Sequence, residues 1–409
     1  MSGALTGDER REQERARWRA AVREILFGNV LIVLIAIVLA LIVGSILIAA
    51  TNEQVQAAAQ YFFARPGDTF SAIWTAISGA YSAFFQGAIY NFRRPEFTAG
   101  IRPLTETLTF ATPLILAGLG IGLTFRAGLF NIGGRGQMLF GAAIGGWVGF
   151  ALPLPPVIHP IVAIVLGVAA GAAWGALAGV LKAYTGAHEV IVTIMLNYVA
   201  YYIVFWMLST PGVLQQPGSI NPKSPPTLES AVLPELFGPQ YRLHAGFLIA
   251  IAAVIGVWWL LERSSLGFRM RAVGENPHAA RTAGIDVKRT TVLAMLLSGG
   301  LVGLAGVNQV LGTETSGITS GVDAGIGFDA ITVALLGRSR PWGILAAALL
   351  FGAFKAGGFS MQAAEGIPID IITVVQALIV LFIAAPPLIR ALFRLPQPGA
   401  RPKAKAVKA

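Results

Sequence analysis

Long apolar stretches, separated by short polar segments, recur along the chain from residue 27 to residue 390. A helix needs about 20 apolar residues to cross the hydrocarbon core of a bilayer, which is about 30 Å thick. The pattern therefore predicts ten transmembrane helices, at 27–50, 104–125, 129–151, 157–181, 189–208, 246–262, 290–312, 326–338, 341–357 and 369–390. We expect an all-α polytopic membrane protein with two pseudo-repeated halves that contain broken or short helices.

Residues 70–90 form a further uncharged segment that is long enough to cross a membrane. Counting this segment as a span would put the two chain ends on opposite sides, against the charge distribution described below. Serine, threonine and glycine interrupt its apolar face, and aromatic residues favour the membrane–water interface. We therefore interpret 70–90 as an interfacial or re-entrant helix.

Composition supports a membrane protein. Hydrophobic residues make up 55% of the chain, charged residues only 12%, and the mean hydropathy is +0.69. A soluble domain carries roughly 25% charged residues, so this chain has too few to cover a water-facing surface. The net charge of +10 is concentrated in the loop at 263–289 and in the C-terminal tail. Cytoplasmic enrichment in lysine and arginine explains that excess better than nucleic-acid binding does.

Four regions follow from this topology. We expect residues 1–26 to form a cytoplasmic N-terminal tail and 27–103 to hold the first span with an external or interfacial segment. Residues 104–390 then form the transmembrane core, and 391–409 a basic cytoplasmic tail. The protein is expected in the inner (plasma) membrane, in contact with the lipid bilayer, with both termini cytoplasmic and no nucleic-acid partner.

The sequence contains little that an enzyme would use. It has no cysteine, which excludes a zinc-thiolate site and a cysteine nucleophile. The four histidines are scattered, and no phosphate-binding loop of the G-x-x-x-x-G-K-[ST] type occurs. We expect no catalytic residue, no metal and no cofactor, so any energy for transport must come from outside the chain.

Glycine recurs every fourth residue along the span at 157–181, at Gly167, Gly171, Gly175 and Gly179. This spacing puts all four on nearly one face of a helix. Such a face lets a neighbouring membrane helix approach closely. We interpret the stripe as a packing feature without a transport role.

Two segments in opposite halves of the chain interrupt or shorten a span. The first, at 127–141, reads AGLFNIGGRGQMLFG and contains Asn131, Arg135 and Gln137; the second, at 325–337, reads GIGFDAITVALLG and contains Phe328 and Asp329. Such paired segments point to the central site of a transporter, although neighbouring helices can also satisfy a simple kink. Charges at membrane depth face a cavity or one another, and a direct Arg135–Asp329 pair is one hypothesis.

The span at 189–208 carries a polar stripe. Thr193, Asn197 and Tyr201 are spaced by four and share one face of the helix. They either line a pathway or make ordinary hydrogen bonds between helices. Tyr198 and Tyr202 flank the stripe and offer aromatic faces to a planar base.

The basic loop contains signals for a short helix. Glu275, Asn276 and Pro277 form a helix-start signal, residues 278–283 favour a helix, and Gly284 is a natural stop. A short helix held on the cytoplasmic face is suited to contact a partner protein.

Four motifs together resemble a known family. They are GLFNIGGRGQMLFGA at 128–142, HEVIVTIMLNYV at 188–199, FRMRAVGENPHAARTAGI at 268–285 and GFDAITVALLGRSRPWGILAAALLFGAFKAGG at 327–358. In this order, across 104–390, they resemble the nucleoside-uptake branch of the ABC importer permeases, a family that includes ribose-type sugar and branched-chain amino-acid permeases.

The resemblance implies an importer with a second permease subunit, a shorter paralogue, two cytoplasmic ATPase subunits and an extracytoplasmic solute-binding protein. It implies a substrate pathway lined by the broken segment at 128–137, by Asn197 and by the region around Asp329. Together with the polar stripe, the candidate pathway residues are Asn131, Arg135, Gln137, Thr193, Asn197, Tyr201, Phe328 and Asp329. The resemblance also implies a coupling helix at 274–284, with ATPase contacts at Gly274, Glu275, Asn276, His278, Ala279, Ala280 and Gly284. One position departs from the family pattern, which commonly has glutamate where this chain has Arg135.

Three alternatives stay open. A simple-sugar permease of the same family shares much of the pattern. An ion-coupled secondary transporter or channel would need buried carboxylates, and only Glu314, Asp329 and Glu365 lie near membrane depth. A membrane enzyme would need a cluster of reactive side chains that the sequence does not offer.

Overall fold

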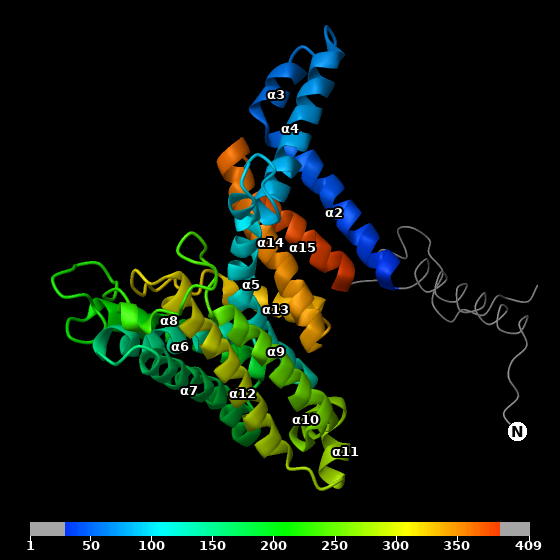
Figure 1. The fold of residues 1–409 in the computed structure, drawn as a ribbon. Helices are drawn as coiled ribbons and strands as arrows, with labels where there is room; N and C mark the ends of the chain where they lie inside the picture. Colours follow the sequence, from blue (N-terminus) through cyan, green and yellow to red (C-terminus); the bar gives the residue numbers. More distant parts are fainter. Residues whose placement is uncertain (1–28, 385–409) are drawn as a thin grey trace, which may run out of the picture. The chain divides into compact units, whose positions relative to one another are not determined.

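The computed structural model describes residues 29–384, so the two predicted tails, 1–26 and 391–409, lie outside the described residues. Every regular element in the described part is a helix, apart from two isolated β-bridges. The described residues divide into two compact units, one within 29–80 and 366–384 and the other within 81–365. The all-α class predicted from the sequence is therefore confirmed (Figure 1).

In the described part of the first unit, α2 (Asn29–Thr51) contacts α15 (Ile369–Ala384). The chain bends by 71° between α2 and α3 (Glu53–Ala59). Asn52 causes this break, since its backbone is extended and its side chain accepts a hydrogen bond from Val55 N, which starts the new helix. The hydroxyl of Thr69, near the start of α4 (Pro66–Ala88), donates to Ala58 O at 3.0 Å.

The second unit contains the long helices. They are α5 (Phe97–Arg126), α6 (Gly134–Ala151), α7 (Ile158–Val180) with the π-turn η1 (Leu181–Thr185), α8 (Glu189–Ser209), α9 (Gly246–Arg263), α12 (Val287–Asn308) with η3 (Gln309–Thr313), α13 (Ile326–Leu336) and α14 (Pro341–Glu365). The short helices η2 (Glu229–Ala231), α10 (Ser265–Glu275) and α11 (Pro277–Thr282) lie in the connections. Among the helices long and apolar enough to cross a membrane, α5 and α12 are the most buried, and both contact several neighbours (Figure 1).

The glycine stripe on α7 packs where the sequence predicted a close neighbour. Gly167, Gly171, Gly175 and Gly179 are all buried against α12. A β carbon added to Gly171 would lie 2.5 Å from Gly299 O, which is closer than real β carbons come to backbone. The two helices therefore touch backbone to backbone, which only small residues permit.

The number of spans differs from the sequence prediction. Six helices of the described residues are long and apolar enough to cross a membrane, and the bent α2–α3 pair makes up to seven. The helices α13 and α15 are apolar but shorter than a full crossing. The number ten is thus not confirmed. The segment predicted as interfacial or re-entrant forms α4, which is not among the candidate spans.

Candidate functional site

The predicted break in the first half lies between α5 and α6, where residues 127–133 are not helical. The side chain of Asn197 on α8 bridges this segment. Its oxygen accepts a hydrogen bond from Gly136 N at 2.8 Å, and its amide group donates to Ile132 O at 2.8 Å. The hydroxyl of Thr193, one turn earlier, accepts from Ile132 N at 3.3 Å. Two members of the predicted polar stripe, Thr193 and Asn197, therefore satisfy backbone groups that the break frees.

Asn131 and Gln137 complete the hydrogen bonding inside the break. Asn131 is fully buried, and its amide group donates to the hydroxyl of Ser298 on α12 at 2.9 Å. Its oxygen accepts from Gly133 N at 2.9 Å, and its side chain bonds with that of Gln137 at 3.2 Å. These buried amides hold the start of α6 in a defined position.

The two shortened segments predicted in opposite halves meet at the starts of α6 and α13. A β carbon on Gly134 would lie 2.7 Å from Gly327 O, and one on Gly327 would lie 2.5 Å from the backbone nitrogen of Arg135. Gly325, which precedes α13, adopts a φ of +76°, a conformation that glycine enters at little cost. The first turns of two helices, with their free N–H groups, are thus in direct contact.

Two ion pairs lie beside this contact. The Arg135 Nε is 3.3 Å from Asp323 Oδ1, and the Asp323 side chain is only 5% exposed. The Arg135 guanidinium also lies 5.0 Å from the ring centre of Tyr201 on α8. Asp329, in the first turn of α13, pairs instead with Lys355 on α14 at 2.8 Å. The hypothesis of a direct Arg135–Asp329 pair is therefore wrong.

Sequence analysis missed Asp323 and Lys355 as partners of these charges. Lys355 stands in the span predicted at 341–357, whereas Asp323 lies just before the marked segment 325–337, and charge near membrane depth was the signal that could have found both. Phe328, between the two ion pairs in sequence, has 48% of its surface exposed. Its ring therefore lies at the surface of the second unit.

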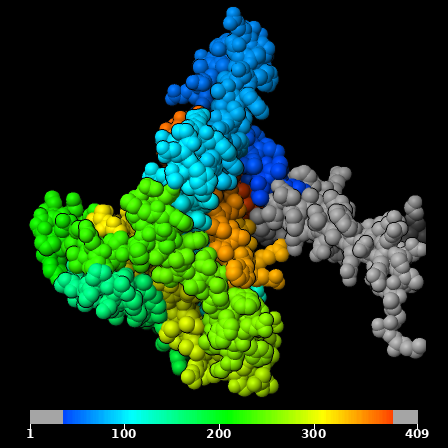
Figure 2. All heavy atoms as spheres, in the orientation of Figure 1, coloured from blue at the N-terminus to red at the C-terminus, as the bar shows by residue number. Residues whose placement is uncertain are grey.

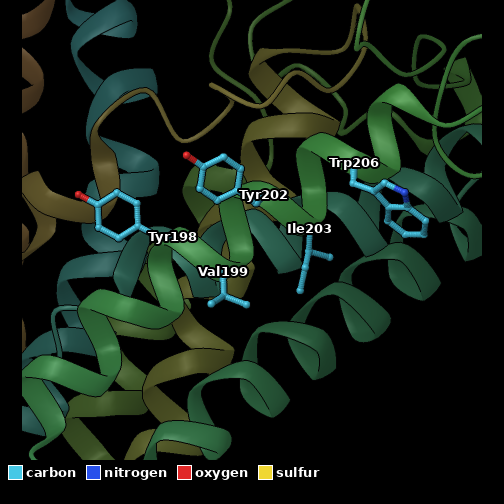
Figure 3. A pocket seen from close by; sticks show the side chains of 5 residues that line it. All are labelled: Tyr198, Val199, Tyr202, Ile203 and Trp206. Atoms are coloured by element: carbon cyan, nitrogen blue, oxygen red, sulfur yellow. The ribbon is translucent and has the colours of Figure 1, made fainter.

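An aromatic groove runs along another face of α8. It has a volume of about 410 Å³ and is lined by Tyr198, Val199, Tyr202, Ile203 and Trp206 (Figure 3). Tyr198 and Tyr202 are more than half exposed, whereas Asn197 is buried. The aromatic faces suggested for a planar base thus open away from the break rather than into it.

The loop between α9 and α12 contains the predicted short helix. It is α11, which ends one residue before the predicted Ala283, and Gly284 follows at a φ of +81°. Asn276 is its N-cap, since its side chain accepts from His278 N at 3.0 Å and from Ala279 N at 3.1 Å. In the space-filling view this loop forms a yellow-green projection (Figure 2).

Exposure divides the residues of this projection. Glu275, Asn276, His278 and Ala279 are exposed, and Ala280 is only 4% exposed. Gly274 lies two residues before the N-cap Asn276 and packs against the backbone of residues 126–128. The projection therefore offers an open outer surface while its inner side touches the body of the second unit. In the described part of the chain no cluster of His, Asp or Glu is arranged to hold a metal ion.

Comparison with known proteins places this architecture among transport proteins. The family model described as branched-chain amino acid transport system, permease component, matches residues 104–384. A guanosine ABC transporter permease protein of Bacillus subtilis is 35% identical over 358 residues, which cover 88% of this chain and 94% of that protein. No solved structure matches this chain.

Two further relatives carry different solute names. A glucose ABC transporter permease protein of Haloferax volcanii is 36% identical over 68% of this chain and 75% of its own length. A nucleoside ABC transporter permease protein of Lactococcus lactis is 32% identical over 75% of this chain and 84% of its own length. In Bacillus subtilis and in Lactococcus lactis a second permease protein, named for the same solute as the first, matches at 29% identity.

Proposed function

Because the chain belongs to the family of branched-chain amino acid transport permease components, we propose that it is the membrane-spanning permease subunit of an ATP-binding-cassette importer for a nucleoside. The observation that carries the proposal is the match to the guanosine permease protein along nearly its whole length. A permease of this family transports and is not an enzyme, so ATP hydrolysis falls to separate cytoplasmic ATPase subunits.

The projecting loop supports an external source of energy. Its outer residues are exposed, and its inner end contacts the segment that leads into the break before α6. In the proposed mechanism an extracytoplasmic binding protein delivers the solute, and the ATPase subunits close on ATP. Residues 274–284 transmit that movement to the spans. In this topology both chain termini and this loop face the cytoplasm of a cell whose inner or plasma membrane holds the complex.

The solute pathway is proposed at the contact between α6 and α13. Arg135, Asp329 and Tyr201 provide charge and an aromatic ring there, and Phe328 provides an exposed ring. Asn131, Gln137, Thr193 and Asn197 fix the backbone beside it. A nucleoside has a planar base and a hydroxylated sugar, which suits this mixture of rings and hydrogen-bonding groups.

A second permease subunit is also proposed. Two relatives come from bacteria that have two permease proteins named for one solute, and this chain matches the first of each pair more closely. We therefore expect a heterodimeric pair in which this chain is the longer member.

Replacing residues 274–284 by a glycine–serine linker of equal length tests the function. Uptake of labelled guanosine should be lost in cells that express the other components, while the amount of this chain in the membrane is unchanged. Retained uptake would exclude the coupling role. Co-purification separates the importer from an ion-coupled carrier, because a carrier brings down no ATPase subunit.

A glucose permease is the second candidate, supported by the relative from Haloferax volcanii. Competition decides between the two solutes. Unlabelled guanosine, but not unlabelled glucose, should reduce the uptake of labelled guanosine, and the opposite pattern with labelled glucose would favour the sugar.

A further inference from the structure

A cavity of about 1010 Å³ lies in the second unit, apart from the contact between α6 and α13. Its lining is dominated by the guanidinium groups of Arg126, Arg263, Arg271 and Arg340 and the indole rings of Trp258 and Trp342, with Glu262 as its acidic residue. Four arginines face one glutamate, so the lining carries a net positive charge. The transport function proposed above uses none of these side chains.

The positive charge of this cavity is not neutralised by the described part of the protein. No ion pair there involves any of the four arginines. Arg126 donates only to a backbone oxygen, that of Ser339, at 3.0 Å. One terminal nitrogen of Arg271 is buried without a hydrogen-bond partner. A buried guanidinium nitrogen without a hydrogen-bond partner costs free energy. A bound anion that accepts a hydrogen bond from it would remove this cost.

The cavity lies where three long helices end or begin. α5 ends at Arg126, α9 ends at Arg263 and α14 begins at Pro341. If these helices span the membrane, their ends lie at the level of the lipid headgroups. The first N–H groups of α14 have no partner within their helix and attract anions. Tryptophan at the ends of membrane helices is typical of the interface, and both Trp258 and Trp342 line the cavity.

We propose that this cavity binds the phosphate headgroup of an anionic phospholipid, such as phosphatidylglycerol. Arginine is suited to phosphate because its planar group donates two parallel hydrogen bonds. The Arg263 guanidinium lies 5.9 Å from the Trp258 ring centre, which holds it at the cavity wall. Exposed apolar side chains on α9, among them Ile255 and Trp259, provide a surface for the acyl chains. Basic pockets between membrane helices on the cytoplasmic side bind such headgroups.

The test compares lipid retention among variants of the full chain in its assembled complex. Arg271→Gln together with Arg340→Gln removes two charges from the cavity. Arg269→Gln together with Arg289→Gln removes two from exposed positions on the same side and is the matched control. Arg271→Lys together with Arg340→Lys keeps the charge. Each complex is purified from nanodiscs of phosphatidylcholine mixed with phosphatidylglycerol, and bound lipid is measured by native mass spectrometry.

We expect the cavity variant to bind phosphatidylglycerol roughly a hundredfold more weakly than the wild type, because it loses two charge-assisted contacts and each contributes on the order of a tenfold factor in affinity. The control and the lysine variant should retain it. Equal retention by the cavity variant would overturn the proposal. Displacement of the lipid by glycerol 3-phosphate at millimolar concentration would overturn the lipid source in favour of a soluble phosphate. Unchanged lipid with loss of the ATPase subunits would identify a protein-docking surface instead.

Discussion

The α carbon of Gly274 lies 2.9 Å from the point where a β carbon on Gly128 would stand. Gly274 belongs to the last turn of α10 and is the first residue of the predicted coupling helix at 274–284, and Gly128 lies in the non-helical segment 127–133 before α6. Two motifs that are distant in the sequence are therefore in backbone contact. Through this one contact, a movement of α10 and α11 would act directly on the non-helical segment that Asn197 bridges.

Substituting Gly274 by alanine tests this route. The added methyl group would meet the backbone of Ala127 and Gly128 at 2.9 Å, and rigid backbone cannot move aside as a flexible side chain can. Overpacking of this kind typically costs about 1–3 kcal/mol. We expect this strain to disfavour the conformation in which Gly274 and Gly128 touch, and about 1.4 kcal/mol between two conformations changes their ratio tenfold. Uptake should fall by about that factor, with the amount of protein in the membrane unchanged.

Gly256→Ala is the matched control for that substitution, because a β carbon at this position on α9 has no neighbour within 4 Å. It should leave uptake at the wild-type rate. Full uptake by the Gly274 variant would show that the contact with Gly128 transmits nothing.

Local sequence signals predicted α11, though not α10 before it. The cap at Asn276, the proline after it and the glycine stop at Gly284 act within a few residues, so no knowledge of the tertiary fold is needed. The glycine stripe on α7 was predictable for the same reason, since helical periodicity alone puts its members on one face.

The partners of the charged residues were not predictable in this way. Asp323 and Asp329 are six residues apart, and either could have met Arg135 by membrane depth alone. The turn between them determines which aspartate pairs with Arg135, because Ala324 and Gly325 both have positive φ and redirect the chain into α13. The start of α6 at Gly134 rather than 129 likewise depends on hydrogen bonds from α8, which the local sequence does not contain.

The Arg135–Asp323 pair should show energetic coupling. Removing one partner of a buried ion pair leaves an uncompensated charge and costs about 3–5 kcal/mol. We expect Arg135→Gln and Asp323→Asn each to lower the thermal unfolding midpoint of the purified protein, and the double variant to lower it by less than the sum. The coupling energy should lie at roughly 0.5–3 kcal/mol.

Asp329 supplies the control for this cycle, since it pairs with Lys355 and not with Arg135. Combining Arg135→Gln with Asp329→Asn should give nearly additive effects. Stronger coupling to Asp329 than to Asp323 would show that the pairing in the membrane differs from the one described here.

Asn197→Ala should destabilise the protein through the backbone it leaves unpaired. Gly136 N and Ile132 O would both lose a hydrogen bond of 2.8 Å in a buried place, and each buried unsatisfied group costs about 1–3 kcal/mol. We expect a lower thermal unfolding midpoint and reduced guanosine uptake. Tyr198→Phe, which removes only an exposed hydroxyl from the next residue, should change neither.

The ratio of two rates shows whether Asn197 also acts in transport. If uptake falls more than the ATPase rate of the assembled complex, the residue affects the solute pathway. Equal falls of both rates would limit its role to holding the start of α6.

The stability of the protein should depend on pH through His244, which lies before α9 and is 1% exposed. Burial, with a contribution from Arg242, lowers the pKa of His244 to about 4 from an ordinary 6.5. Between pH 6.5 and pH 4 the His244 imidazole is therefore protonated in the unfolded chain but neutral in the folded chain. Stability should be constant above pH 6.5 and fall by about 3 kcal/mol as the pH drops to 4.

His244→Gln should flatten that part of a melting-temperature profile, whereas His278→Gln, at an exposed position on α11, should not. Identical slopes for the wild type and His244→Gln would assign the acid sensitivity to other groups.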